Sequence, residues 1–350
     1  MTSSEGGPIR VGVAGLGRSG WGIHVRALRE MTDRFKVVSV LDSLEERRKQ
    51  AADELGCRTC ESYEELLADG EVELVVVAMP SALHVPWSLQ ALEAGKHVVV
   101  EKPVSRDLDE CDRLIAAAKA SNFTVTVFQN KRYSPDFLKI REVVDSGVLG
   151  PVNFIRVVSM SYRRRWDWQT VKKLGGGSLR NTVIHTLDAL MEFSGEADPE
   201  VYCKLDRVLT SGDAEDWVQL ILTAPDAPTM EIDLFANCAY RQGGWLVLGR
   251  KGTLITEDRQ VKWKVVKGFD ELPERKLDLN PTPDRSYNHE KLEFEEFSWD
   301  PEESGRGGAD SSFYADVYAH LREGAAQAIT LESVRRRMKV VDYCLKNCGV

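Results

Sequence analysis

The stretch "IRVGVAGLGRSG", residues 9 to 20, decides the fold of this chain. An apolar run rich in valine is followed at once by Gly15, Gly17 and Gly20 in the spacing G-x-G-x-x-G, and a helical pattern begins directly after them. In a strand-turn-helix unit such glycines permit a tight turn and let the backbone approach a pyrophosphate, which the helix N-terminus stabilises. The stretch therefore predicts a dinucleotide-binding βαβ unit, with Arg18 and Ser19 in the cofactor loop.

The residues that follow repeat the alternation of strand and helix. Continuous apolar runs such as the one before Pro80 are typical of strands that are buried on both faces of a parallel sheet. The series predicts a doubly wound parallel sheet, a Rossmann domain, for residues 1–130. Strand patterns lie at residues 35–42, 72–80, 97–104 and 123–130, and helical patterns at 23–31, 44–56, 86–95 and 109–122.

The pattern changes after residue 130. A helical segment at 134–147 leads into strand-like runs whose alternation favours a mainly antiparallel open sheet with one covered face. A chain of 350 residues exceeds one core, so we expect a second α/β domain at residues 131–350. Residues 268–310 are interpreted as an irregular excursion, and two helices, near 311–324 and 331–347, are expected to close the chain.

The bulk composition favours a globular protein with a small-molecule ligand. The formal net charge of −9 argues against nucleic acid and anionic membranes as partners. The N-terminal residues lack the pattern of a signal peptide and no apolar run is long enough to span a bilayer, so a cytoplasmic protein is expected. The seven cysteines are odd in number and scattered, which agrees with a reducing compartment. Cys57 and Cys60 form a C-x-x-C without a second pair, so we expect no metal site.

Asp42 bears on the choice of cofactor. It ends the second predicted strand, where a carboxylate accepts hydrogen bonds from a ribose diol and repels a 2′-phosphate. The sequence therefore favours NAD over NADP. Arg47 and Arg48, about one helical turn later, can soften that preference.

A polar helix face is predicted in "GGGSLRNTVIHTLD", residues 175 to 188. Helical spacing places Asn181, His185 and Asp188 on one face, at i, i+4 and i+7. The opposite stripe, which is apolar, would pack into a core. It consists of Val183, Ile184, Leu187, Leu190 and Met191.

A second polar group is expected at the edge of the parallel sheet. The run "HVVVEKPV" ends with Glu101 and Lys102 at its carboxyl end, which in open α/β sheets is where ligands bind. The ammonium group of Lys102 would then point toward the cofactor crevice.

Several motifs together resemble the glucose-fructose oxidoreductase and inositol dehydrogenase family, often written Gfo/Idh/MocA. They are "GLGRSG", "AMPSALH", "AGKHVVVEKP", "GVLGPV", "GGGSLRNTVIHTLD" and "LGRKGTL", in the order and approximate spacing of that family, and the closing "FYADVYAHLREG" and "ESVRRRMKVVDYC" extend the match over nearly the whole chain. The resemblance implies a nicotinamide-dependent oxidoreductase that acts on secondary hydroxyls of sugars and cyclitols. It also implies a homodimer or homotetramer.

The resemblance assigns roles to particular residues. Lys102 and His185 would meet at the substrate beside the nicotinamide, and Asp188 would complete the motif. Pro80 and His84 would belong to the cofactor side. This sequence departs from the family pattern D-x-G-x-H-x-x-D at two positions. Asn181 stands in place of the first aspartate and Val183 in place of the glycine.

The chemistry of alcohol oxidation gives these residues their tasks. Removing hydride from a CH–OH carbon needs a base for the hydroxyl proton and a positive group beside the developing alkoxide. We expect His185 to be the base and Lys102 to polarise the oxygen and share the proton. Asn181 and Asp188 would hold neighbouring hydroxyls. Since an amide at position 181 removes a negative charge, we expect His185 to stay neutral.

The loop "SYRRRWDWQT", residues 161 to 170, offers further binding groups. Trp168, or its neighbour Trp166, can pack a flat ring against a sugar, and Arg163, Arg164 and Arg165 can pair with a carboxylate or phosphate. A plain exposed loop is the alternative. Arg132 is expected to line the cleft or to hold the domains together.

Three functions remain open from the sequence. The first is an NAD-dependent dehydrogenase that converts a sugar, cyclitol or glycoside into a keto-sugar. The second is redox-neutral glycoside cleavage, in which the same oxidation acidifies a neighbouring C–H bond and NAD is regenerated in place. The third is a non-catalytic dinucleotide or sugar sensor.

Overall fold

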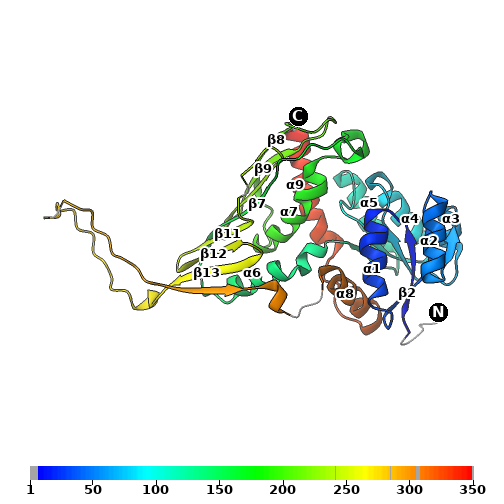
Figure 1. Cartoon of the computed structure of the whole chain (residues 1–350), viewed down its shortest axis with the longest axis horizontal. Coiled ribbons are helices and arrows are strands. Elements are labelled where there is room, and N and C mark those ends of the chain that lie inside the picture. The colour runs from blue at the N-terminus through cyan, green and yellow to red at the C-terminus, as the bar shows by residue number, and fades with distance from the viewer. Residues whose placement is uncertain (1–6, 241, 284, 305–307, 349–350) are drawn as a thin grey trace.

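The computed structural model describes residues 7–240, 242–283, 285–304 and 308–348. The first six residues, which bear on the signal-peptide prediction, lie outside these ranges. A parallel sheet wrapped by helices lies beside a larger, twisted sheet (Figure 1). Together they confirm the predicted fold class.

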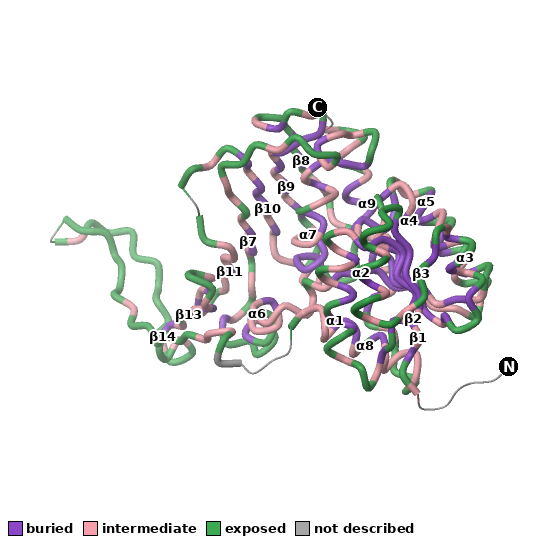
Figure 2. Tube along the Cα trace, turned by 45° about the vertical axis from the view of Figure 1, so that its right-hand side comes forward, coloured by how far each residue is buried: buried purple, intermediate pink, exposed green. Residues whose placement is uncertain are grey.

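The parallel sheet has six strands in the order β3-β2-β1-β4-β5-β6. Its central strands are apolar on both faces because helices cover both sides, and they form the buried centre of this unit (Figure 2). The short strand β3 and the helix α3 were not predicted from the sequence. The strands are β1 Ile9–Ala14, β2 Phe35–Leu41, β3 Arg58–Cys60, β4 Leu74–Val77, β5 His97–Val100 and β6 Val125–Val127; the helices are α1 Arg26–Arg29, α2 Glu45–Leu55, α3 Tyr63–Ala68, α4 His84–Glu93 and α5 Leu108–Ala120.

The carboxyl ends of the central strands meet at one edge of this sheet. Strand β1 pairs in parallel with β4, and β4 pairs in parallel with β5. Gly15 after β1, the loop after β4 and Glu101 after β5 are therefore neighbours in space. This edge faces the second unit.

The second sheet has eight strands in the order β14-β13-β12-β11-β7-β10-β9-β8. Only the pair β7 and β10 is parallel, so the prediction of a mainly antiparallel sheet is confirmed. Strand β14 corrects the interpretation of 268–310 as wholly irregular. The strands are β7 Val152–Met160, β8 Glu200–Asp206, β9 Trp217–Thr223, β10 Thr229–Phe235, β11 Trp245–Gly249, β12 Gly252–Glu257, β13 Gln260–Val266 and β14 Phe294–Trp299.

Helices cover one face of this sheet and leave the other open. The covering helices are α6 Pro135–Asp145, α7 Ile184–Leu190 and α9 Leu331–Asn347 (Figure 1). Alternate residues of β9, Val218, Leu220 and Leu222, are fully buried beneath them. The long connection between β13 and β14 projects away from the body of the protein and is largely exposed (Figure 2).

The C-terminal helices return to the first unit. Helix α8, Ala309–Glu323, packs against α1 and against the turn Asn130–Tyr133, and α9 packs against α5, β6 and β8. Both helices were predicted, but their contacts with the parallel-sheet unit were not. The domain boundary at residue 130 stays a prediction.

The sequence also led to predictions about the cysteines, metal binding and membrane-spanning segments. The seven cysteines are free thiols. Among the described residues, no group of three or more histidines, cysteines or carboxylates is arranged to hold a metal ion. A search of the same residues finds no helix with the length and apolar character needed to cross a membrane.

Candidate active site

The glycine loop after β1 is shaped by close backbone contacts. Gly15 has φ of 96°, and a Cβ atom on it would lie 2.5 Å from the carbonyl oxygen of Ala78. A Cβ on Gly20 would lie 1.8 Å from the carbonyl oxygen of Gly15. At Gly17, by contrast, a Cβ would meet only Arg47, at 3.9 Å. The loop is therefore tight where it turns and open at its middle glycine, which fits a pyrophosphate.

Asp42 fastens this loop to the end of β2. Its carboxylate is nearly buried and accepts hydrogen bonds from the backbone N–H of Leu16 at 2.7 Å and of Leu44 at 2.9 Å. Arg47 donates to the same carboxylate at 3.3 Å. A carboxylate offers about four acceptor positions, so one remains for a ribose hydroxyl. Of the loop residues predicted to contact the cofactor, Arg18 is exposed and Ser19 is half-buried.

Lys102 links the parallel sheet to the second unit. Its Nζ donates a 2.7 Å hydrogen bond to the backbone carbonyl of Asn181. Burial lowers the pKa of Lys102, the charge of Glu101 opposes this, and the charge of Arg18 adds to it. A lysine with a lowered pKa beside a cofactor loop is suited to proton chemistry.

Glu101 belongs to a buried chain of polar groups that begins on α8. The hydroxyl of Tyr314 and Nδ1 of His24 are 2.7 Å apart, and Nε2 of His24 lies 3.3 Å from Oε1 of Glu101. Oε2 of Glu101 accepts from the backbone N–H of Lys102 at 3.1 Å. Burial raises the pKa of Glu101, but the hydrogen bond and charge of His24, with the charges of Lys102 and His84, bring it down to about 2. An ionised Glu101 therefore stays beside Lys102 at neutral pH.

His84 supports the backbone at the same edge. Its Nδ1 lies 2.7 Å from the carbonyl oxygen of Pro103, and its Nε2 lies 2.8 Å from that of Met79. Burial lowers the pKa of His84, although both carbonyls oppose the shift. The ring thus connects the loops after β4 and β5, where Pro80 begins the next turn. Both ring nitrogens already face protein atoms, so His84 joins the two loops, and its predicted place on the cofactor side stays a prediction.

The second unit presents a wide helical turn to Lys102. Residues Leu179–Val183 form a π-helical turn that continues into α7. Such turns are frequent at functional sites. Gly177 precedes it with φ of 116°, and a Cβ there would lie 2.3 Å from the carboxylate of Glu215. Glu215 accepts a hydrogen bond from the backbone N–H of Leu179 at 2.9 Å, so the glycine is needed for this close approach.

Asn181 and His185 both lie at this turn. The backbone N–H and side-chain Nδ2 of Asn181 donate to the carbonyl of Gly177 at 3.0 and 2.9 Å. Within the described ranges, the buried Nδ1 of His185 has no hydrogen-bond partner. Burial, followed by the charge of Lys102, lowers the pKa of His185 to about 3. The imidazole is therefore neutral at physiological pH. Its predicted role as the base stays a prediction.

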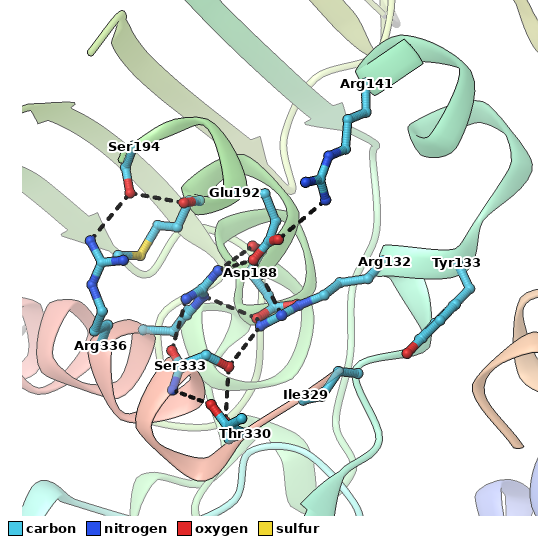
Figure 3. Close-up of polar contacts among 12 residues, drawn as sticks. Arg132, Tyr133, Arg141, Asp188, Glu192, Ser194, Ile329, Thr330, Ser333 and Arg336 are labelled. Carbon is cyan, nitrogen blue, oxygen red and sulfur yellow. Dashed lines mark hydrogen bonds and ion pairs between the residues drawn. The ribbon is translucent and has the colours of Figure 1, made fainter. Parts of the chain in front are cut away.

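Asp188 differs from the prediction. Its side chain is fully buried, and its two carboxylate oxygens accept a pair of 2.7 Å hydrogen bonds from Arg132 (Figure 3). Arg337 of α9, which is also buried, lies 3.1 Å from Asp188 and pairs with Glu192. We therefore replace the role of substrate ligand with one of positioning α7. For Arg132 the contacts favour the second prediction, a group that holds elements together.

A polar cavity of about 340 Å³ lies beside the wide turn, between it and the ends of β7 and β10. Asn181 is part of its wall. Within the described part of the chain Trp168 is not, and 42% of its surface is exposed in the turn Trp168–Thr170, so its predicted stacking on a sugar has no support in this geometry. The wall consists of Ser159, Met160, Ser161, Arg163, Arg165, Gln169, Thr170, Gly177, Ser178, Asn181, Thr182, Thr210, Glu215, Asp216, Leu234 and Ala236.

Some groups at the site were missed in the sequence. Gln129 lies two residues after the end of β6 and is buried, and both polar atoms of its side chain lack a partner among the described residues. Its position at the carboxyl end of a parallel strand was the available signal. No sequence signal pointed to Glu215, Tyr314 or Arg337, because their partners are far away in the sequence.

Comparison with known proteins agrees with this arrangement. The model of an oxidoreductase family with an NAD-binding Rossmann fold matches residues 9–129, and the Gfo/Idh/MocA C-terminal domain model matches residues 137–255. The fold and the glycine loop thus define an oxidoreductase with a nicotinamide-cofactor domain. The chain belongs to the Gfo/Idh/MocA family.

Similar proteins include both curated relatives and solved structures. An uncharacterized oxidoreductase of Schizosaccharomyces pombe is 31% identical over 71% of this chain and 70% of its own. A scyllo-inositol 2-dehydrogenase (NADP+) of Bacillus subtilis is 30% identical over 53% of this chain and 52% of its own. The crystal structure of an NAD-binding protein from Listeria innocua superposes with a TM-score of 0.82, at 25% identity over 97% of each chain.

Proposed function

We propose that this protein is an NAD-dependent dehydrogenase that oxidises a secondary hydroxyl of a sugar or cyclitol to a ketone. The observation that carries the proposal is the position of neutral His185 at the same turn whose backbone binds Lys102, with no hydrogen-bond partner on its buried Nδ1 among the described residues. The inositol dehydrogenase among the relatives supports this substrate class.

The residues divide the chemistry between them. When bound, the nicotinamide supplies a hydride acceptor for the hydrogen on the carbinol carbon. The neutral imidazole of His185 takes the hydroxyl proton as the C=O bond forms. The ammonium group of Lys102 stabilises the negative charge that develops on the oxygen. Ionised Glu101 favours the charged form of Lys102, and Asn181 binds a neighbouring hydroxyl from the cavity wall.

The preference for NAD is part of the proposal. It rests on the free acceptor position of Asp42, which suits a ribose hydroxyl. Arg47, which lies next to both Asp42 and Gly17, is the group that would admit a 2′-phosphate. Michaelis constants for NAD and NADP in wild type and in Arg47→Ala test this. A wild type that prefers NADP would contradict the role of Asp42.

The direct test is NADH formation from NAD+ with a panel of cyclitols, aldoses, uronates and glycosides. We expect stoichiometric NADH with at least one compound and none with Lys102→Ala. Product formation without net NADH would favour redox-neutral cleavage. Binding of NAD+ without turnover of any compound would favour the sensor.

We also propose that the protein is a homo-oligomer formed through the open face of the large sheet. That face carries the stacked rings of Trp217 and Phe235, whose centroids are 4.3 Å apart, and Tyr202, which is 55% exposed. An exposed aromatic surface of this kind favours a partner. Sedimentation that detects only monomer at micromolar concentration would contradict the proposal.

A further inference from the structure

Among the described residues, the cavity wall contains one arginine whose side chain has no protein partner. Arg165 is held by Asp167, at 2.9 and 2.8 Å, and by Gln169 at 2.6 Å. Arg163 also lines the cavity, but within the described part of the chain its side chain makes no hydrogen bond or ion pair. Its backbone is fixed, since its N–H donates to the carbonyl of Ala236 at 2.9 Å. The guanidinium is thus anchored at its base and free at its tip.

The two acidic residues of the wall are already occupied by the protein. The carboxylate of Asp216 accepts backbone hydrogen bonds from Val208, Leu209 and Thr210, at 2.7, 2.9 and 2.7 Å. The carboxylate of Glu215 accepts the N–H of Leu179 at 2.9 Å, and burial raises the pKa of Glu215. Neither carboxylate forms an ion pair with Arg163, so its guanidinium group remains available to a ligand.

We propose that the substrate is an anionic sugar or cyclitol and that Arg163 binds its carboxylate or phosphate group. A guanidinium presents paired donors to such a group, and Ser161, Ser178 and Thr182 line the same cavity and bring hydroxyls that can donate further hydrogen bonds. Asn181 lies in the same wall, and its backbone carbonyl accepts the hydrogen bond from Lys102, so the cavity adjoins the turn that carries the proposed reaction centre. This inference rests on the proposed function, because it specifies the substrate of that site.

The chain offers a matched control for Arg163. Arg164 is its neighbour and is also exposed, but it is not part of the cavity wall within the described residues. Arg163→Gln and Arg164→Gln therefore remove the same charge from the same loop. Arg163→Lys keeps the charge but loses the paired donors.

The experiment measures binding of glucuronate, glucose 6-phosphate and glucose by calorimetry to the full chain saturated with NADH, so that no oxidation occurs. We expect at least one anionic sugar to bind at least tenfold more tightly than glucose. Arg163→Gln should weaken that binding by about tenfold or more, Arg163→Lys by less, and Arg164→Gln hardly at all. Which anion binds more tightly distinguishes a carboxylate from a phosphate substrate.

Three results would overturn the inference: equal binding of anionic and neutral sugars, equal losses in Arg163→Gln and Arg164→Gln, or no binding of either anion at millimolar concentration. NADH formation in parallel assays separates this inference from the proposed function. Turnover of neutral sugars that Arg163→Gln leaves unchanged would keep the dehydrogenase and reject the anion site. If an anion bound in a way that depends on Arg163 but no sugar were turned over, the anion site would stand and the dehydrogenase would be rejected.

Discussion

The glycine loop and the α7 helix lie on opposite sides of the proposed active site, and they differ in where their partners lie in the sequence. Gly15, Gly20 and Asp42 are shaped by contacts with the same loop and with the strands next to β1. Asp188, by contrast, depends on Arg132 and Arg337, which are 56 and 149 residues away. A local motif therefore specified the first region well, but helical spacing showed only which residues share a face in the second. It did not show what that face meets.

The largest effect is expected for Lys102→Ala, which removes the group that joins the two regions. We expect kcat/KM to fall by about 10³ because the developing alkoxide loses its positive partner. Lys119→Ala is the control, since that lysine forms an exposed ion pair with Glu332. Steady-state NADH formation measures both variants. Comparable rates for Lys102→Ala and wild type would remove Lys102 from the reaction.

The next effect concerns the stability of the buried ion-pair network. Arg337→Met leaves Asp188 and Glu192 without one of their cations, so we expect the free energy of unfolding to fall by about 3 kcal/mol. Arg335 lies on α9, as Arg337 does, and forms an exposed ion pair with Asp112 of α5. Arg335→Met removes this pair and should lower the free energy of unfolding by about 0.5 kcal/mol. Denaturant unfolding gives both values. Similar losses in the two variants would mean that the buried network is no more important than a surface pair.

The pH dependence of kcat/KM tests how His185 and Lys102 divide the proton transfer between them. His185 must be neutral and Lys102 protonated in our proposal, so the rate should be flat above the His185 pKa of about 3. It should fall at alkaline pH, at a value below the ordinary lysine pKa of 10.5, because burial lowers the pKa of Lys102. Each limb should change about tenfold per pH unit. A rate that instead rises through an alkaline pKa would make Lys102 the base.

The smallest effect is expected for Asn181→Asp, which restores the aspartate of the family pattern. A carboxylate near His185 favours the imidazolium, so the pKa of His185 should rise. We expect kcat/KM to fall severalfold near about pH 5 while changing little near neutrality. An unchanged pH profile would show that position 181 does not control the charge of His185.

These contrasts explain how much the sequence could predict. The parallel sheet, its glycine loop, and the positions of Lys102 and His185 follow from local spacing, because strand and helix periods place residues without knowledge of their partners. The catalytic role of His185 stays a prediction. The burial of Asp188 beside Arg337 and the chain from Tyr314 to Glu101 depend on how α8 and α9 fold back, which no local pattern reveals. Strand β14 was missed for a similar reason, since only its pairing with β13 defines it.

The most direct test of this division compares His185→Gln with Asp188→Asn, measuring kcat/KM and unfolding free energy on the same preparations. Our account predicts that His185→Gln loses about 10³ in kcat/KM while its stability stays within about 1 kcal/mol of wild type. It predicts that Asp188→Asn loses about 3 kcal/mol of stability and, where folded, retains kcat/KM within about tenfold. If instead both variants lost activity and stability together, the helix would act as one unit, and the separation of its chemical and structural residues would be wrong.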